Sequence, residues 1–394
     1  MFNRLGLKTN LKSRFVLATL ACVSLAFAIS STPAAAWERG SVENFTVPSG
    51  SPMMEGLIVG RDGNVYVSTF DPTGATGMPA QVLTFNTDGA LLNRKALFLS
   101  QPSGGETKPS TAMLGLAFRP EKNSFALYVI DFGLGNVLSV NPKTGASSVC
   151  ITLDLGSLPP DHPGPGLNAL TFDAAGNTYI SDSFIGVIWK LTGKACGTAE
   201  PWVQDDLLKP NRCTTPTDPT TCNSTSKGAF MDIPPFGANG VEFNNEATAM
   251  FVCNTAFDWI VKIPFDSTTG DHGTPAVLTN SINGCDGIAI DKSDNIWAAA
   301  NQADEIVVVN PSGKVIAKLG DFDGVQGGVT QGLLFPASPA FSKDGQSLFV
   351  TNLELDLTTI GLPQTVDSQW AAKVKQHSIA KLEAQIPQQS GNQQ

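Results

Sequence analysis

The sequence predicts an all-β protein, a six-bladed β-propeller with four-stranded blades around a central channel. A short apolar run, a turn and a second apolar run recur six times along the chain. The turns are mostly rich in Gly, Asn and Asp, as tight hairpins require. Aromatic and β-branched residues dominate the second runs, and no helical spacing competes with them. Sandwiches and barrels also contain alternating strands, but six similar units with a recurrent turn are typical of a propeller.

The first run of each unit is apolar at most positions, which is expected of an inner strand buried on both faces. These first runs begin at Met54, Leu114, Leu167, Ala238, Cys285 and Ala337. The second runs cover residues 65–68, 126–130, 178–181, 250–253, 296–299 and 348–351. A third strand and a reverse turn close most units, as at 137–145 and 306–313. The last unit lacks some of its strands, so we expect residues 41–47 to supply its outer strand and close the ring.

The N-terminus has the composition of a cleaved export signal. Four basic residues, from Arg4 to Arg14, precede an apolar stretch at 15–29, and small residues follow at 34–36. This order of charge, apolar run and small-residue site is typical of a secretory signal peptide. We therefore expect residues 1–36 to be removed and the protein to be periplasmic or secreted.

The rest of the chain is expected to form one domain, because the units are evenly spaced, although the length alone would suit two. The propeller is predicted to cover residues 37–385, with an insertion at 205–236, and residues 386–394 are expected to form a disordered polar tail. Insertions of this kind fall before inner strands and therefore on one face of the propeller. There they could serve as a lid or as binding loops.

The charge balance limits the classes of partner. The whole chain has a net charge of −10, and the signal carries four basic and no acidic residues, so residues 37–394 carry −14. Nucleic acid is not expected as a partner, because it needs a basic face. No stretch after the signal approaches the roughly 18 to 20 uninterrupted apolar residues of a membrane span. A small-molecule substrate is the expected partner, and a protein partner is left open.

Six cysteines remain after the signal, and disulfides are the default in an exported protein. Three pairs are candidates: Cys213 with Cys222, Cys253 with Cys285, and Cys150 with Cys196. The first pair flanks a short Pro/Thr-rich segment. Closing this segment with a disulfide would stabilise the fold by about 2 to 3 kcal/mol in the chain-entropy model. The second pair falls near the same end of neighbouring units, and the third follows by elimination. Sequence alone does not settle the connectivity.

At one fixed place in the unit, four copies carry a residue with a side-chain oxygen. These residues are Glu55, Asn168, Asn239 and Asp286, and the other two copies have Leu114 and Ala337. In a propeller this position surrounds the central channel, so the four side chains would form a ring of two carboxylates and two amides. Calcium prefers oxygen ligands, and two carboxylates balance its charge. We expect Ca²⁺, with Mg²⁺ or Mn²⁺ left open, whereas zinc and copper would use His or Cys.

A second polar set lies where the returning strand leaves the sheet. An antiparallel partner ends on the face where the inner strand begins, so these residues are expected to surround the ring. The set that we consider as surrounding residues comprises Asp131, Asp182, Asn254 and Asn301. Asp and Asn are also common in the turns that follow strands, so turn formation is the competing interpretation.

Two stretches carry a resemblance to a known family. They are Ala238–Val241 with its following strand, and Cys285–Asp291 through residues 295–298. At these residues the chain resembles the family of senescence marker protein, gluconolactonase and the luciferin-regenerating enzyme. The members are six-bladed propellers related more distantly to paraoxonases and strictosidine synthases. The resemblance covers roughly residues 50–355.

The resemblance implies a metal site at the mouth of the channel. Glu55, Asn239 and Asp286 match the positions that bind a divalent cation in the family, usually calcium. Asn168 matches an Asn that lies beside the metal and contacts substrate or water there. Paraoxonase-like members place a catalytic His where this chain has Leu114, so a mechanism driven by histidine is not expected.

The chemistry of the ring predicts a hydrolase. Four protein ligands leave coordination positions open, so a lactone or ester carbonyl can bind there and be polarised while a carboxylate removes a proton from water. We expect an exported, metal-dependent hydrolase of a lactone or related ester, with Asp286 as general base and Asn168 as a second catalytic residue. Asp131 or Asp182 could assist. The alternative is a non-catalytic propeller that binds a sugar, a peptide or a protein, with a structural ion.

Overall fold

The structure, a computed structural model, describes residues 39–100, 103, 105–120, 126–160, 162–210, 236–362 and 364–386. Regular structure in this part of the chain is almost entirely β-strand. The exceptions are the helix α1 (Val366–Ala371) and the 3₁₀ turns η1 (Leu155–Ser157), η3 (Thr255–Phe257) and η4 (Leu357–Ile360). Among the described residues, no helix combines the length and apolar character needed to cross a membrane. The predicted signal, Cys213, Cys222 and residues 387–394 lie outside the described residues.

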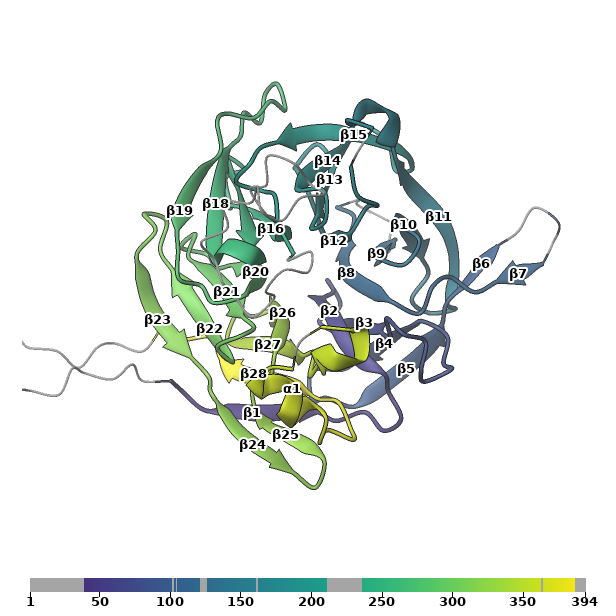
Figure 1. Ribbon diagram of the computed structural model, residues 1–394, viewed down its shortest axis with the longest axis vertical. Helices are drawn as coiled ribbons and strands as arrows, with labels where there is room; N and C mark the ends of the chain where they lie inside the picture. Colours follow the sequence, from purple (N-terminus) through teal and green to yellow (C-terminus); the bar gives the residue numbers. More distant parts are fainter. Residues whose placement is uncertain are drawn as a thin grey trace, which may run out of the picture. The chain divides into compact units, whose positions relative to one another are not determined.

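The strands form antiparallel meanders of four (Figure 1). Three meanders are separate sheets with their strands in chain order: β2 (Met53–Val59), β3 (Val65–Phe70), β4 (Gln81–Phe85) and β5 (Leu91–Ala96); β16 (Ala238–Phe243), β17 (Ala249–Asn254), β18 (Trp259–Pro264) and β19 (Ala276–Thr279); and β20 (Cys285–Ile290), β21 (Ile296–Ala300), β22 (Glu305–Val309) and β23 (Val315–Leu319). A fourth is built from both ends of the chain: β26 (Pro336–Phe341), β27 (Ser347–Asn352), β28 (Ile379–Glu383) and β1 (Val42–Thr46).

The other two meanders share one continuous sheet. They are β8 (Met113–Phe118), β9 (Leu127–Asp131), β10 (Asn136–Val140) and β11 (Ala146–Leu153), and β12 (Leu167–Phe172), β13 (Thr178–Asp182), β14 (Val187–Leu191) and β15 (Gly197–Gln204). Parallel pairing of the outer strands β11 and β15 joins them. Two hairpins are added to the meanders: β6 (Phe98–Ser100) with β7 (Glu106–Thr107), and β24 (Phe322–Gln326) with β25 (Val329–Gly332).

The first strands of the meanders form a closed ring. Each lies beside the next in the order β2, β8, β12, β16, β20 and β26, and β26 lies beside β2 (Figure 1). A closed ring of antiparallel meanders confirms the predicted all-β propeller class. Six separate blades stay a prediction, because β8 to β15 form one sheet.

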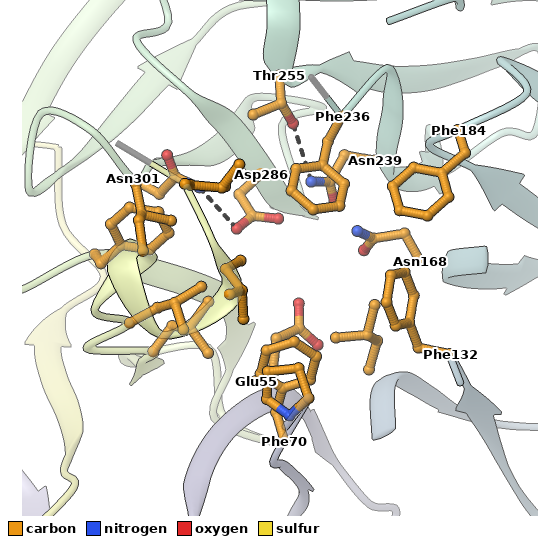
Figure 2. Close-up of a pocket in the computed structure, with 18 of the residues that line it drawn as sticks. Glu55, Phe70, Phe132, Asn168, Phe184, Phe236, Asn239, Thr255, Asp286 and Asn301 are labelled. Carbon is orange, nitrogen blue, oxygen red and sulfur yellow. Dashed lines mark hydrogen bonds between the residues drawn. The ribbon is translucent and has the colours of Figure 1, made fainter. Parts of the chain in front are cut away.

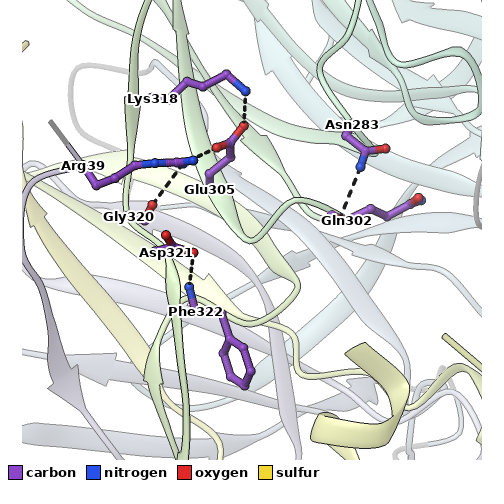
Figure 3. Close-up of polar contacts among 8 residues, drawn as sticks. All are labelled: Arg39, Asn283, Gln302, Glu305, Lys318, Gly320, Asp321 and Phe322. Atoms are coloured by element: carbon purple, nitrogen blue, oxygen red, sulfur yellow. Dashed lines mark hydrogen bonds and ion pairs between the residues drawn. The ribbon is translucent and has the colours of Figure 1, made fainter. Parts of the chain in front are cut away.

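The N-terminal segment completes the last meander, as predicted. β1 is the outermost strand and pairs antiparallel with β28, with Val42 opposite Leu382. Arg39, just before β1, forms an ion pair with Glu305 on β22 (Figure 3). The Arg39 carbonyl also accepts a hydrogen bond from Gly320 N at 2.7 Å. The N-terminal segment therefore also fastens the last meander to its neighbour.

The apolar core lies between adjacent meanders. Five of the second strands are buried along their whole length: β3, β9, β13, β17 and β21. Each therefore packs on both faces, as the continuous apolar runs in the sequence indicate. Trp189 and Trp297 are the largest of the fully buried side chains. Such packing leaves the inner strands little freedom to move, which fixes the side chains at their ends.

Candidate metal centre and active site

The predicted ring residues occupy the same place in every inner strand, at a β-bulge. Between Met54 and Leu57, three residue steps on β2 match two on β3, because Met54 pairs with Thr69 and Leu57 with Val67. The same shift occurs in the other five inner strands, across the residues after Met113, Leu167, Ala238, Cys285 and Pro336. A bulge redirects a side chain that would otherwise alternate with its neighbours. In this ring it directs the four polar side chains toward the channel (Figure 2).

The residue after each ring position must be small, because neighbouring inner strands approach closely there. A Cβ atom on Gly240 would lie 2.3 Å from the carbonyl oxygen of Asp286, and one on Gly56 would lie 2.4 Å from that of Leu114. Real side chains do not tolerate such distances. The small residue therefore allows each inner strand to pack against the backbone of the next ring residue.

Hydroxyl groups from the second strands bind the bulges and connect the ring. Ser68 Oγ accepts a hydrogen bond from Gly56 N at 3.1 Å and donates one to Leu114 O at 2.6 Å. Thr351 Oγ1 accepts from Ser338 N at 3.0 Å and donates to Glu55 O at 2.5 Å. These contacts satisfy the backbone donors that a bulge leaves unpaired. They also hold the ring residues in place before any ligand binds.

The four predicted ring residues lie together at the bottom of a cavity of about 400 Å³. We call this polar surface the floor: Glu55, Asn168, Asn239 and Asp286, with Thr255 and Asn301 beside them. The four ring side chains are at most 6% exposed. Figure 2 shows Glu55 facing Asp286 and Asn239 across the cavity, with Asn168 to one side. The fold thus brings into one site residues that are far apart in the sequence.

The hydrogen bonds of the floor leave some of its buried oxygen atoms without a partner. Asn239 Nδ2 donates to Thr255 Oγ1 at 3.0 Å, and Asn301 Nδ2 donates to Asp286 Oδ2 at 3.0 Å. Three buried oxygens on this floor have no hydrogen-bond partner: Glu55 Oε2, Asn239 Oδ1 and Asn301 Oδ1. A buried polar atom without a partner costs about 1 to 3 kcal/mol, so three such atoms close together are expected of a site that binds a ligand. Carboxylate and amide oxygens are the ligands that calcium prefers, so the residues fit a hard divalent cation.

The electrostatics of the floor agree with this fit. Burial raises the pKa of Glu55 well above its usual value, and the nearby Asp286 carboxylate raises it further. Burial also raises the pKa of Asp286, to about 7, against hydrogen bonds from Asn301 and Asn239 that lower it. Two buried carboxylates that destabilise each other's charge are stabilised by a cation between them. The described residues contain no group of three or more His, Cys, Asp or Glu suited to a metal ion, so this oxygen set does not resemble a zinc site.

The four surrounding residues predicted from the sequence have different positions. Asn301 lies on the floor and contacts Asp286. Asp131 accepts hydrogen bonds from the Ser110 and Leu134 backbone N–H groups, and Asp182 accepts four donors, three of them backbone N–H groups. Asn254 donates to two loop carbonyls. Three of the four residues do not line the cavity and instead hold loops in place: Asp131, Asp182 and Asn254. Their position agrees with the competing interpretation, that they form the turns after the strands.

Two disulfides occur in the described part of the chain, Cys253–Cys285 and Cys150–Cys196. Both are among the pairs named from the sequence. The first joins β17 to the residue before Asp286, and Cys285 O also accepts a hydrogen bond from Thr255 Oγ1 at 2.7 Å. It therefore fixes the backbone of the floor. The second joins β11 to the residue before β15, among the outer strands.

The side walls of the cavity were not predicted from the sequence. One side consists of phenylalanines: Phe70, Phe132, Phe184 and Phe236. The other side consists of Phe335 and aliphatic residues between Leu353 and Leu362. We call these residues the wall. A sequence signal for the first side exists, because Phe132 directly follows the strand-end residue Asp131, and Phe184 lies two residues after Asp182.

Comparison with known proteins gives a family match in the second half of the chain. Residues 232–353 match the model of a family described as SMP-30/Gluconolactonase/LRE-like region. This segment contains Asn239, Asp286 and Asn301. No curated protein matches the chain.

Several solved structures share the fold over most of the chain. A gluconolactonase from Xanthomonas campestris is 11% identical, with a TM-score of 0.54 over 89% of this chain and 91% of its own. Regucalcin from Agrobacterium tumefaciens, described as a calcium-binding protein, is 16% identical, with a TM-score of 0.52 over 87% and 92%. A luciferin-regenerating enzyme is 14% identical, with a TM-score of 0.53 over 87% and 95%. The chain thus has the fold of these propellers, and it resembles the SMP-30/gluconolactonase/LRE-like family, as the sequence predicts.

Proposed function

We propose that the protein is a metal-dependent hydrolase of a lactone or related carboxylic ester. The observation that carries this proposal is the floor of the cavity, where buried carboxylate and amide oxygens without partners face a space large enough for a small molecule. The family match and the gluconolactonase of similar fold support a lactonase-type reaction. Calcium is the proposed ion, with Mg²⁺ or Mn²⁺ as alternatives, because the oxygen set is that of a hard cation.

The residues of the floor have separate roles in this proposal. Glu55, Asn239, Asp286 and Asn168 hold the cation, which when bound supplies a Lewis acid for a carbonyl oxygen. Thr255 orients the Asn239 amide so that its oxygen, and not its nitrogen, faces the cavity. Asn301 fixes the orientation of the Asp286 carboxylate.

Asp286 is the proposed general base, and Asn168 is proposed to orient the substrate. The Asp286 carboxylate takes a proton from the attacking water, whose oxygen forms a bond to the carbonyl carbon. The ester C–O bond then breaks, and the leaving oxygen takes the proton. One water is consumed, and no other reactant is needed. A base of this kind contributes about 10² to 10⁴ in rate.

The same floor would also suit a structural ion in a propeller that only binds a sugar, peptide or protein. The two functions differ in turnover and not in metal binding. Purified residues 37–394 would be tested on gluconolactone, dihydrocoumarin, butyrolactones and acyl-homoserine lactones, with calcium and with chelator. Turnover that is lost with chelator while the circular dichroism spectrum is unchanged supports the hydrolase. A lower melting temperature with chelator and no turnover of any compound supports the binding propeller.

We also propose that the protein is exported, to the periplasm or beyond the cell. Two disulfides in the described residues support this location, because disulfides persist in oxidising compartments. Mass spectrometry of the N-terminus of the protein from the periplasmic fraction tests it. Cleavage after residue 36 is the expected result.

A further inference from the structure

The wall contains a continuous arc of aromatic rings above the floor. The ring centroids of Phe70 and Phe132 are 6.4 Å apart, and those of Phe132 and Phe184 are 5.6 Å apart. Phe184 stacks on Phe236 at 5.6 Å with an angle of 24° between the planes. Figure 2 shows these rings bordering the same space that the floor faces. Phe70 is the last residue of β3, whereas Phe132, Phe184 and Phe236 lie in three different loops, so the arc brings together segments that are far apart in the sequence.

The opposite side of the wall is apolar and held firmly. Leu353 N donates to Phe335 O at 3.0 Å, and Phe335 N donates to Asp304 Oδ1 at 2.8 Å. Leu355 and Leu357 continue this side and are at most 5% exposed. A molecule that enters the cavity therefore meets hydrocarbon on both sides before it reaches the floor.

Polar groups are scarce on the wall. Of the described residues that line the cavity above the floor, Thr73 alone has a polar side chain, and its hydroxyl donates to Asp71 Oδ1 at 3.3 Å. A polyhydroxylated ring would lose water from its hydroxyl groups here without gaining hydrogen bonds from the wall. Each such group costs about 1 to 3 kcal/mol when it is buried without a partner. An aromatic ring loses no hydrogen bonds, and it can pack edge-to-face or stack on the arc.

We propose that the cavity selects neutral aryl lactones or aryl esters over sugar lactones. The carbonyl group lies at the floor, and the aromatic part packs between the phenylalanine arc and the aliphatic side. The catalytic consequence of this selectivity rests on the proposed hydrolase function, but the selectivity of binding can be measured without turnover. The cavity volume of about 400 Å³ suits a bicyclic compound, because drug-sized ligands occupy pockets of about 300 to 1,000 Å³.

The first experiment measures binding with lactams, which resist hydrolysis. Dihydroquinolinone is the lactam analogue of dihydrocoumarin, and gluconolactam is that of gluconolactone. Both present a carbonyl in a ring of the same size, but one has a fused benzene ring and the other has hydroxyl groups. Isothermal titration calorimetry of residues 37–394 with calcium should give at least about tenfold tighter binding of dihydroquinolinone. Equal binding, or tighter binding of gluconolactam, would overturn the proposed selectivity.

The second experiment places the selectivity in the arc. Phe184→Ala should weaken dihydroquinolinone binding about tenfold and leave gluconolactam binding unchanged. Leu134→Ala is the matched control, because Leu134 lies near the arc in sequence, is 55% exposed and does not line the cavity. If Phe184→Ala and Leu134→Ala behave alike, the arc does not bind the ligand.

Turnover separates this proposal from the proposed function. If dihydroquinolinone binds selectively but dihydrocoumarin is not hydrolysed, the selectivity stands and the hydrolase proposal fails. If gluconolactone is hydrolysed with a higher kcat/KM than dihydrocoumarin, the hydrolase proposal stands and the selectivity fails. For an active enzyme, Phe184→Ala should raise KM for dihydrocoumarin and change kcat little, because the ring binds the ground state and the transition state alike.

Discussion

The floor and the wall of the cavity are built in different ways. Four of the floor residues, Glu55, Asn168, Asn239 and Asp286, occupy one position that is repeated in six inner strands, each with the same bulge and a small residue after it. The wall residues come from the end of β3, from the 3₁₀ turn η4 and from several loops, and only their apolar character is shared. The floor is therefore fixed by the architecture, whereas the wall can change without disturbing the propeller. We infer that the chemistry resides in the floor and the choice of substrate in the wall.

The largest expected effect is on the floor. Asp286→Ala removes one of two carboxylates and the proposed base, so kcat/KM for dihydrocoumarin should fall about a thousandfold or more. Calcium binding, measured by calorimetry, should weaken as well. Asp323→Ala is the control, because Asp323 is exposed and far from the lining residues in sequence. Retained turnover in Asp286→Ala would mean that another group activates water.

Removing each disulfide in turn compares how the floor and the outer strands depend on their covalent links. They close segments of similar length, with sequence separations of 32 and 46. The chain-entropy model therefore gives about 4 kcal/mol for each, so the two Cys→Ser double variants should lose similar stability in urea. Only Cys253→Ser with Cys285→Ser should also weaken calcium binding, because Cys285 precedes Asp286 and holds the Thr255 hydroxyl. Equal calcium affinity in both double variants would show that the floor does not depend on its disulfide.

A single methyl group tests the close approach of the inner strands. Gly240→Ala places a Cβ atom 2.3 Å from Asp286 O, so it should destabilise the fold by about 2 to 3 kcal/mol and displace the Asp286 backbone. Gly164→Ala is the matched control, since a Cβ there meets no atom within 4 Å. Urea unfolding and calcium titration of both variants give the comparison. A stable Gly240→Ala variant with normal calcium binding would contradict the tight ring.

The floor could be predicted from the sequence because the repeat supplies its own alignment. Asn168, Asn239 and Asp286 stand at the same place in their units, and side chains with an oxygen atom at one repeated position are visible without a structure. The closure of the ring by residues 41–47 was predictable for the same reason, since one unit lacked a strand. The small residues after the ring positions follow from the same repeat, but their reason, the close approach of the next backbone, is visible only in the folded structure.

The wall could not be predicted because loops have no such internal alignment. Phe236 is the last residue of the predicted insertion at 205–236, and Leu353 to Leu362 lie in a segment without a counterpart in the other units. The strand-end acids show a second limit of sequence analysis. The sequence leaves both a place around the ring and a role in turns open for Asp131 and Asp182, and in the structure their oxygens accept hydrogen bonds from backbone N–H groups. A polar residue at a strand end therefore does not reveal whether it faces a ligand or its own loop.

The smallest expected effect concerns the support of the wall. Asp304 accepts the Phe335 N–H, and burial raises its pKa to about 7, with further increases from Asp367, Asp321 and Glu305. The pKa of Asp304 in the folded protein is about 7, above the ordinary value of 3.8. At a pH between these two values, Asp304 is therefore protonated in the folded protein and ionised in the unfolded chain. Stability should therefore fall as the pH rises toward 7, and the loss is complete above it.

Asp304→Asn keeps an oxygen for the Phe335 N–H and removes the charge. Between pH 5 and pH 8 the wild-type protein should lose about 1 to 2 kcal/mol of unfolding free energy more than the variant, since one pKa unit corresponds to about 1.4 kcal/mol and partial exposure reduces the effect. Urea unfolding of both proteins at the two pH values measures this difference. The floor should not be affected, so calcium affinity at pH 8 should be the same in both. Parallel stability profiles would mean that Asp304 is ionised in the folded protein, and that its bond to Phe335 holds the wall without a titrating proton.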